Sequence, residues 1–93
     1  MGLLYPPIMV MNSNAAAQPS GITVGSSPYT YVNADLTPVS VLISGGTVTT
    51  IAFSRDNTNY LTIGLLGGMY LLNPGDRIRI TYVLAPIMTK IPR

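Results

Sequence analysis

Residues 38–56, PVSVLISGGTVTTIAFSRD, decide the fold that we expect. Apolar and small polar residues alternate over residues 39–44, and a second run of β-branched and apolar residues covers residues 47–54. Both runs are typical of β-strands. Gly45-Gly46 lies between them, and a glycine pair can take positive φ at both central positions of a two-residue turn without a Cβ clash. The stretch therefore predicts a β-hairpin.

A two-residue turn would also fix which side chains share a face of this hairpin. One face would be almost wholly apolar, with Val39, Val41, Ile43, Val48, Thr50 and Ala52. The opposite face, which holds Leu42, Ile51 and Phe53, is mixed instead of polar. A ribbon with apolar side chains on both faces needs cover on both, from its own sheet and from a partner. We therefore expect Leu42, Ile51 and Phe53 at a partner interface.

The rest of the chain predicts further short strands separated by turns. We expect these strands at residues 22–24, 29–33, 60–63, 69–72 and 77–83. Asn73-Pro74-Gly75-Asp76 predicts a type II turn, because Pro presets φ at the second position and Gly supplies positive φ at the third. No window shows helical periodicity over ten residues. The pattern predicts an all-β fold, a single small sandwich or barrel over residues 22–84.

Two segments that contain prolines flank this domain. We expect an extended N-terminal arm at residues 1–21 and an extended C-terminal tail at residues 85–93, which could lie along a sheet edge. The arm has no positive n-region, so it does not fit a signal peptide. It is rich in large apolar side chains, which we expect to anchor the protein to a neighbour or to fold back on its own domain: Leu3, Leu4, Tyr5, Ile8, Met9 and Val10.

The composition indicates a surface that is largely covered. Only 9% of the 93 residues are charged and 47% are hydrophobic, whereas charged residues make up about 25% of a typical soluble domain. A free monomer keeps more charge for solubility, so we expect a homo-oligomer. The longest apolar run, residues 61–72, includes three glycines and is about half as long as a spanning helix, so we expect no membrane partner.

The inventory of catalytic and ligating side chains is nearly empty. The chain has no Cys and no His, which removes the usual zinc ligands, the commonest general base and the best nucleophile. The three acidic residues, Asp35, Asp56 and Asp76, each fall in a predicted turn, where Asp commonly caps the backbone. We therefore expect no enzyme activity, no cofactor and no metal.

Three other hypotheses name particular residues. Asp56, Asn57 and Asn59 could offer oxygen ligands to calcium, although a single carboxylate predicts weak binding. Tyr29 and Tyr31 lie two residues apart, so they could form a stacking platform for sugars in a carbohydrate-binding module or a tail-associated adhesin.

Nucleic-acid binding is the third hypothesis. The basic residues are scattered through the chain and the net charge is only +2, whereas a nucleic-acid site usually has a dense basic patch with stacking aromatic residues. Binding would require Arg77 and Arg79 to be exposed, and its affinity would fall steeply with salt. We do not expect a nucleic-acid partner.

Four segments, taken in order, resemble a known family. They are residues 25–33 (GSSPYTYVN), 44–56 (SGGTVTTIAFSRD), 72–82 (LNPGDRIRITY) and 85–93 (APIMTKIPR). Together they resemble small structural proteins of tailed bacteriophages, and most of all the head accessory proteins called decoration or cement proteins. The resemblance covers residues 22–93, and the N-terminal arm carries none of it.

This resemblance implies a jelly-roll-like β-sandwich on the outside of a virion. Such a protein is made in the host cytoplasm, binds the major capsid protein and stabilises the capsid shell, and a trimer is favoured over a dimer. Arg77 and Arg79 join the residues that we expect at the partner interface.

Overall fold

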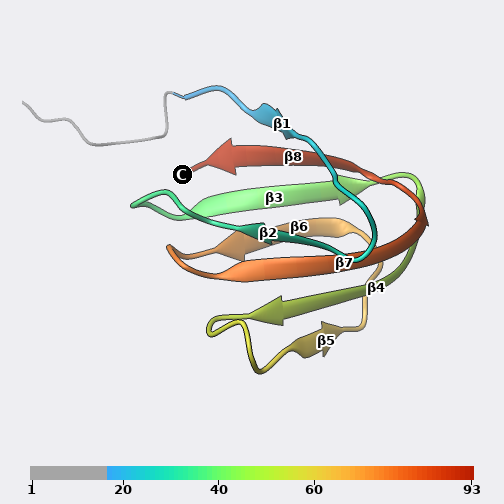
Figure 1. Ribbon diagram of the computed structural model, residues 1–93. Coiled ribbons are helices and arrows are strands. Elements are labelled where there is room, and N and C mark those ends of the chain that lie inside the picture. Colours follow the sequence, from blue (N-terminus) through green and yellow to red (C-terminus); the bar gives the residue numbers. More distant parts are fainter. Residues whose placement is uncertain (1–16) are drawn as a thin grey trace, which may run out of the picture.

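The computed structural model describes residues 17–93 as two four-stranded antiparallel sheets that pack together (Figure 1). The strands are β1 (Ser20–Ile22), β2 (Tyr29–Val32), β3 (Val39–Ser44), β4 (Thr47–Ser54), β5 (Leu61–Ile63), β6 (Gly68–Leu72), β7 (Arg77–Leu84) and β8 (Ile87–Pro92). Sheet A has the order β1-β8-β3-β6, and sheet B has the order β2-β7-β4-β5. The described residues contain no helix. The expected all-β sandwich is confirmed, and its strand order is that of an eight-stranded jelly roll.

The connections between the strands are sorted to two ends of the sandwich (Figure 1). Four of them cross from one sheet to the other at one end, which we call the arch end: residues 23–28, 45–46, 64–67 and 85–86. The other three turn at the opposite end, which we call the loop end: residues 33–38, 55–60 and 73–76. Every strand therefore runs between a connection at the arch end and a connection or a terminus at the loop end.

The predicted hairpin of residues 38–56 is wrong. β3 pairs with β6 and β8 in sheet A, whereas β4 pairs with β5 and β7 in sheet B. Gly45 and Gly46 do have positive φ, at 71° and 67°, but their turn is an arch that joins the two sheets. The arch lets the apolar sides of both strands enter one core, whereas a hairpin would leave these sides beside each other and in need of another layer.

A β-bulge in β4 changes which of its side chains enter the core. Val48 pairs with Tyr82 and Thr50 pairs with Thr81, so Thr49 is an extra residue opposite β7. The strict alternation that we expected is therefore shifted by one position after Val48. Ile51 consequently lies in the core with no exposed surface, which corrects its assignment to a partner interface. Phe53 is half-buried and packs against the same core.

The C-terminal segment is an interior strand and not a tail at a sheet edge. β8 lies between β1 and β3, with a continuous register to β3 from Ile87 to Pro92. The two prolines are compatible with this position because Pro86 precedes the strand and Pro92 ends it. Arg93 continues the pairing by donating its backbone N–H to the carbonyl of Pro38 at 3.2 Å. β1 likewise begins at Ser20, inside the segment that we expected to be an arm.

The core is built from the inward faces of both sheets. Its buried members are all aliphatic or Met: Val39, Val41, Ile43, Val48, Ile51, Leu72, Ile78, Ile80 and Met88. Half-buried aromatic side chains, including those of Tyr29, Tyr31 and Tyr82, pack against its margin.

A polar network closes the core at the loop end. The side chain of Asn33, which is 1% exposed, donates through Nδ2 to the carbonyls of Thr37 and Leu72, both at 3.0 Å. Its backbone N–H donates to the carbonyl of Asp76, and its carbonyl accepts from the N–H of Gly75, both at 2.9 Å. Asn33 thereby joins the end of β2 in sheet B to the end of β6 in sheet A.

The turn at residues 73–76 has the type II geometry that the sequence predicts. Asp76 donates its backbone N–H to the carbonyl of Asn73 at 2.9 Å, and Gly75 has a φ of 87°. The buried carboxylate of Asp76 accepts from the N–H of Asn73 at 2.9 Å, so both the backbone and a side chain hold this turn closed.

The arch at residues 45–46 provides a matched pair of glycine substitutions. Both glycines have positive φ, and an Ala in that conformation costs roughly 1–2 kcal/mol. A Cβ at Gly45 would meet nothing, whereas a Cβ at Gly46 would lie 2.6 Å from the carbonyl oxygen of Leu84. We expect Gly46→Ala to lower the free energy of unfolding by at least about 2 kcal/mol more than Gly45→Ala does, as measured by urea denaturation. Equal losses would contradict this account of the arch.

Removal of the Asn33 side chain should be more damaging than removal of an exposed amide. Asn33→Ala leaves the buried carbonyl of Leu72 without its donor, and we expect a loss of about 2–4 kcal/mol in the free energy of unfolding. Asn59→Ala is the control, because Asn59 is exposed and donates only to a neighbouring carboxylate; it should cost less than about 1 kcal/mol. A loss at Asn33 no greater than that at Asn59 would show that the network does not hold the sheets.

Candidate interaction surface

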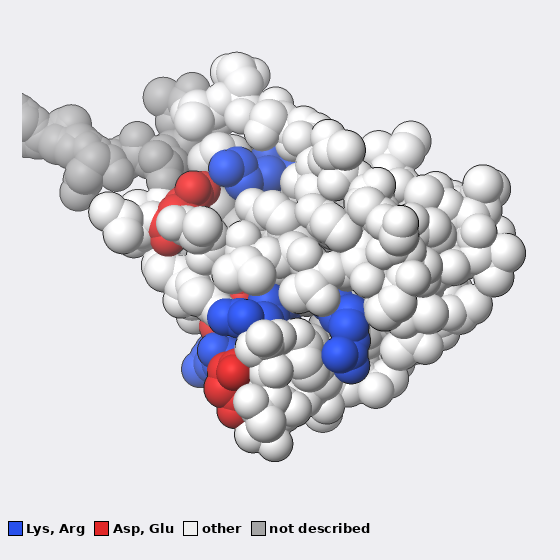
Figure 2. All heavy atoms as spheres, viewed as in Figure 1, with Lys and Arg blue, Asp and Glu red and all other residues white. Residues whose placement is uncertain are grey.

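All the charged side chains of the chain lie in the half of the sandwich nearest the loop end. In the view of Figure 2 the coloured side chains lie in the left and central parts, and the right part, where the arches are, shows none. The five basic and three acidic residues are Asp35, Arg55, Asp56, Asp76, Arg77, Arg79, Lys90 and Arg93. They come from the three loops of this end, from the first residues of β7 and from the last residues of the chain. The arch end contains no charged residue.

The arch end exposes large apolar side chains instead. Five residues on or beside the connections at this end are between 53% and 79% exposed: Leu65, Leu66, Val83, Leu84 and Ile87. The connections that carry them lie close together: a Cβ on Gly46 would lie within 2.7 Å of backbone atoms of Leu84 and Ala85, and a Cβ on Gly67 would lie 3.2 Å from the carbonyl oxygen of Ile43. We call these five residues the apolar end.

The outer face of sheet A continues this apolar surface. The residues that alternate with the buried positions of β3 and β8, together with the residues of β6 that pair with them, point away from the core. On β3, β6 and β8 they include Leu42, Met69, Leu71, Ile87 and Ile91. Ile87 belongs to both the apolar end and this face. The expected interface residue Leu42 is half-buried here, in the middle of the sheet.

One charged side chain reaches the outer face of sheet A. Arg93 donates from Nε to the hydroxyl of Ser40 at 2.8 Å and contacts the sulfur of Met69 through Nη2 at 3.4 Å. The guanidinium therefore extends from Ser40, near the loop end of β3, to Met69 of β6, which pairs with Leu42 further towards the arch end. The remainder of the face presents apolar, Thr and Ser side chains.

The outer face of sheet B differs in chemistry from that of sheet A. Arg77 and Arg79 point outward from β7, as the sequence predicts, beside Thr30 on β2. Both arginines are engaged within the chain: the guanidinium of Arg79 lies 3.8 Å from the ring centre of Tyr60, and Nη2 of Arg77 donates to the carbonyl of Gly75 at 3.3 Å. These contacts give the two arginines a role in covering their own sheet.

The candidate calcium ligands Asp56, Asn57 and Asn59 lie in one turn, where their side chains hydrogen-bond within residues 56–60. Both carboxylate oxygens of Asp56 accept hydrogen bonds, from the backbone N–H groups of Asn59 and Thr58 at 2.8 and 2.9 Å and from Nδ2 of Asn59 at 2.8 Å. Asn57 Oδ1 accepts from the hydroxyl of Tyr60 at 2.6 Å. Donors therefore occupy the oxygens that a cation would need. Residues 17–93 contain no group of three or more Asp, Glu, His or Cys side chains that could hold a metal ion.

The other two acidic residues also serve the fold. Asp35 forms an ion pair with Lys90 at 3.1 Å, and Asp76 forms one with Arg55 at 3.3 Å. Turn formation thus accounts for Asp56 and Asp76, while Asp35 links the β2–β3 loop to β8.

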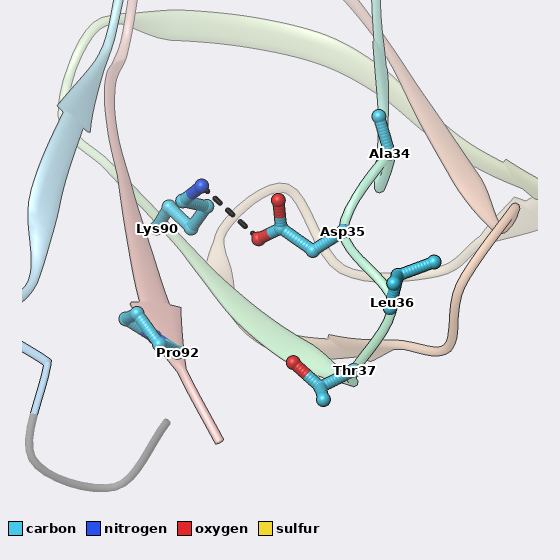
Figure 3. Close-up of a pocket in the computed structure, with 6 residues that line it drawn as sticks. All are labelled: Ala34, Asp35, Leu36, Thr37, Lys90 and Pro92. Carbon is cyan, nitrogen blue, oxygen red and sulfur yellow. Dashed lines mark hydrogen bonds and ion pairs between the residues drawn. The ribbon is translucent and has the colours of Figure 1, made fainter. Parts of the chain in front are cut away.

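The Asp35–Lys90 ion pair spans a shallow groove of about 550 Å³ at the loop end (Figure 3). The groove is lined by Ala34, Asp35, Leu36, Thr37, Lys90 and Pro92. Its two charges neutralise each other, and the other polar side chain of its lining is that of Thr37. The groove has neither the donor set of an anion site nor the paired acids of a hydrolase.

The proposed tyrosine platform faces the core. Tyr29 pairs with Ile80 and Tyr31 pairs with Ile78, so both rings lie on the inward side of sheet B and pack against buried residues. Burial raises the pKa of the Tyr31 hydroxyl. Because their ring faces are used in packing, these two residues do not provide an open stacking surface for a sugar.

The remaining interface candidates, Leu3, Leu4, Tyr5, Ile8, Met9 and Val10, lie outside the described residues. The apolar end was not among the expected sites. A signal for it does exist in the sequence, since no charged residue occurs between Asp56 and Asp76 or between Arg79 and Lys90. The topology is needed to bring these two uncharged stretches to the same end.

Comparisons with known proteins found no match: no family model, curated protein or solved structure matches this chain. Within residues 17–93 there is also no helix that could span a membrane.

The Asp56 turn predicts a dependence of stability on pH. Hydrogen bonds from the backbone of Asn59 and Thr58 hold the pKa of Asp56 well below its ordinary value of 3.8. A lowered folded pKa gives stability that is complete above the unfolded pKa and is lost as the pH falls towards the folded one. We expect the free energy of unfolding of the native chain to fall more below about pH 4 than that of Asp56→Asn. Parallel urea titrations of the two proteins at several pH values would measure this, and identical slopes would contradict it.

Proposed function

We propose that this chain is a structural protein of a bacteriophage virion, a decoration or cement protein that binds the outside of the capsid and stabilises the shell of the major capsid protein. The observation that carries the proposal is the partition of the surface. Charged groups occupy the loop end, while the arch end and most of the outer face of sheet A are uncharged and apolar. The sequence resemblance to decoration proteins gives the class of partner.

The apolar surface has the chemistry of a docking site. Exposed apolar patches of a few hundred Å² or more on small proteins commonly mark interaction sites. On a decorated particle, the apolar end and the outer face of sheet A would rest against the shell, and the loop end with its charges would face solvent. Arg77 and Arg79, which are engaged on the outer face of sheet B, fall outside the contact in this arrangement.

The energetics favour several linked copies over a single one. Full burial of a large apolar side chain contributes about 1.5–3 kcal/mol, so the five residues of the apolar end, already partly buried, offer roughly 5–10 kcal/mol. Association costs about 4–15 kcal/mol in lost freedom of motion, and one copy would therefore bind weakly. A homo-oligomer makes the later contacts intramolecular and raises the overall affinity. The N-terminal arm, if it anchors each copy to a neighbour, would add to the same effect.

The first test is the composition of the particle. Virions of the phage that encodes this chain should contain it at a fixed ratio to the major capsid protein, as measured by quantitative mass spectrometry. Electron microscopy of the same particles should place it on the outside of the head. Its absence from purified virions, or its location in the tail, would overturn the proposal.

The second test is a substitution where the two parts of the apolar surface meet. Ile87→Asp puts a charge at a residue that is 69% exposed and belongs to both the apolar end and the outer face of sheet A. We expect it to lower the affinity for particles that lack the protein at least about tenfold, which corresponds to about 1.4 kcal/mol. Leu36→Asp is the control, because Leu36 is 95% exposed at the loop end. Cosedimentation gives the affinity, and equal binding by both variants would rule out this surface.

A further inference from the structure

β6 is an edge strand with none of the features that usually protect a sheet edge. Natural edge strands are kept from pairing with other chains by charged residues, prolines, bulges or short length. β6, with the sequence GMYLL, has no charged residue and no Pro. Its five residues pair with β3 without a register shift, so no bulge turns the edge away. Its other side pairs with no strand of residues 17–93.

The other three edges of the sandwich are less suited to pairing. β1 and β5 have three residues each, and β2 has four. β1 also follows Pro19 and contains Gly21, and β2 follows Pro28. β6 is therefore the longest edge among the described strands, and the adjoining 64–67 connection exposes Leu65 and Leu66 beside it.

We infer that two copies of this chain pair antiparallel through their β6 edges, so that sheet A continues from one copy into the other as an eight-stranded sheet. A two-fold axis brings the same edge of both copies together, which requires a strand that is complementary to itself. β6 meets this requirement because none of its own five residues is charged. The one charged group that contacts its outer side, the Arg93 guanidinium at 3.4 Å from the Met69 sulfur, is held over β3 by its hydrogen bond to the Ser40 hydroxyl.

The register of this pairing follows from the length of the strand. Only the register centred on Tyr70 pairs all five residues, with Gly68 opposite Leu72 of the second copy and Met69 opposite Leu71 of the second copy. Met69 and Leu71 are 50% and 60% exposed on the outer face of sheet A, so their mutual contact would bury apolar surface from both copies. Cross-strand apolar pairs of this kind stabilise antiparallel sheets.

Pairing in this way would place both outer faces of sheet A on the same side. Leu42, Ile87 and Ile91 of each copy would then belong to one apolar surface twice as wide. The inference concerns the chain alone and holds whether or not the chain binds a capsid. A chain that pairs through β6 but is absent from virions would overturn the proposed function and leave this inference standing.

A cysteine experiment tests the register directly, because the native chain has no Cys. In the double variant Met69→Cys, Leu71→Cys, each new thiol lies directly opposite a thiol of the second copy, within the range of a disulfide. We expect oxidation to convert most of this variant to a covalent dimer on a non-reducing gel. Each single variant is a matched control, since its two equivalent thiols would be offset by two residues along the strands, roughly 8 Å apart, and should stay unlinked.

Sedimentation of the unmodified chain tests the association itself. We expect a dimer at micromolar concentration, and a Leu71→Lys variant that dissociates at least tenfold more readily, because a Lys on an edge strand opposes pairing. Leu36→Lys, far from β6, should sediment as the native chain does. A native monomer, a native trimer, a dimer that Leu71→Lys leaves unchanged, or a double-cysteine variant that does not cross-link would each overturn the inference.

Discussion

The structure depends on one buried amide. The apolar core holds the two sheets together but does not fix their relative position, because hydrophobic contact is non-directional. Asn33 adds directional hydrogen bonds at the loop end. Its side chain donates to the carbonyls of Thr37 and Leu72, and its backbone exchanges hydrogen bonds with the 73–76 turn. Since an unsatisfied buried amide costs free energy, only one relative position of these three segments is stable. The Arg55–Asp76 ion pair then attaches the β4–β5 loop to the same turn.

The same turn chemistry explains why the charges lie at one end. At the loop end, Asp and Asn side chains satisfy backbone groups that no strand reaches. Two of the five basic residues pair with these acids, Lys90 with Asp35 and Arg55 with Asp76. The arches use uncharged groups instead. Gly45 and Gly46 adopt positive φ, the hydroxyl of Ser27 accepts from the N–H of Tyr82 at 2.9 Å, and the hydroxyl of Tyr70 donates to the carbonyl of Gly67 at 2.6 Å. Most of the few charged residues of this chain therefore lie in the loops of the loop end or pair with them, and the arch end remains apolar.

Sequence patterns predicted the local structure better than the pairing of the strands. The alternation in residues 39–44 and 77–83, the type II turn and the positive φ of three glycines all depend on neighbouring residues, and the structure confirms them. The Gly45-Gly46 connection was assigned to a hairpin because a two-residue turn looks the same locally in a hairpin and in an arch. Ile51 was placed at an interface because the bulge at Thr49 shifts the alternation of inward and outward side chains by one residue. No Gly or Pro near Thr49 indicates this bulge in the sequence. The strand at residues 87–92 was missed because two prolines in nine residues indicated an extended tail. The residues between these prolines nevertheless pair with β1 on one side and β3 on the other. The apolar end needed the topology as well, since Leu65 and Ile87 are distant in sequence.

The apolar surface sets a physical constraint on how this chain can exist. A sandwich of fewer than a hundred residues has little stability to spare, and uncharged strand edges together with exposed Leu, Ile and Val side chains favour nonspecific association. Placing Lys or Glu at Leu71 or Ile87 would remove that hazard at little cost to the core, because both side chains point away from it. The chain nevertheless keeps them apolar while it places charged groups at the opposite end. This is the pattern expected of a surface that a specific partner covers, since such a partner turns the hazard into binding energy.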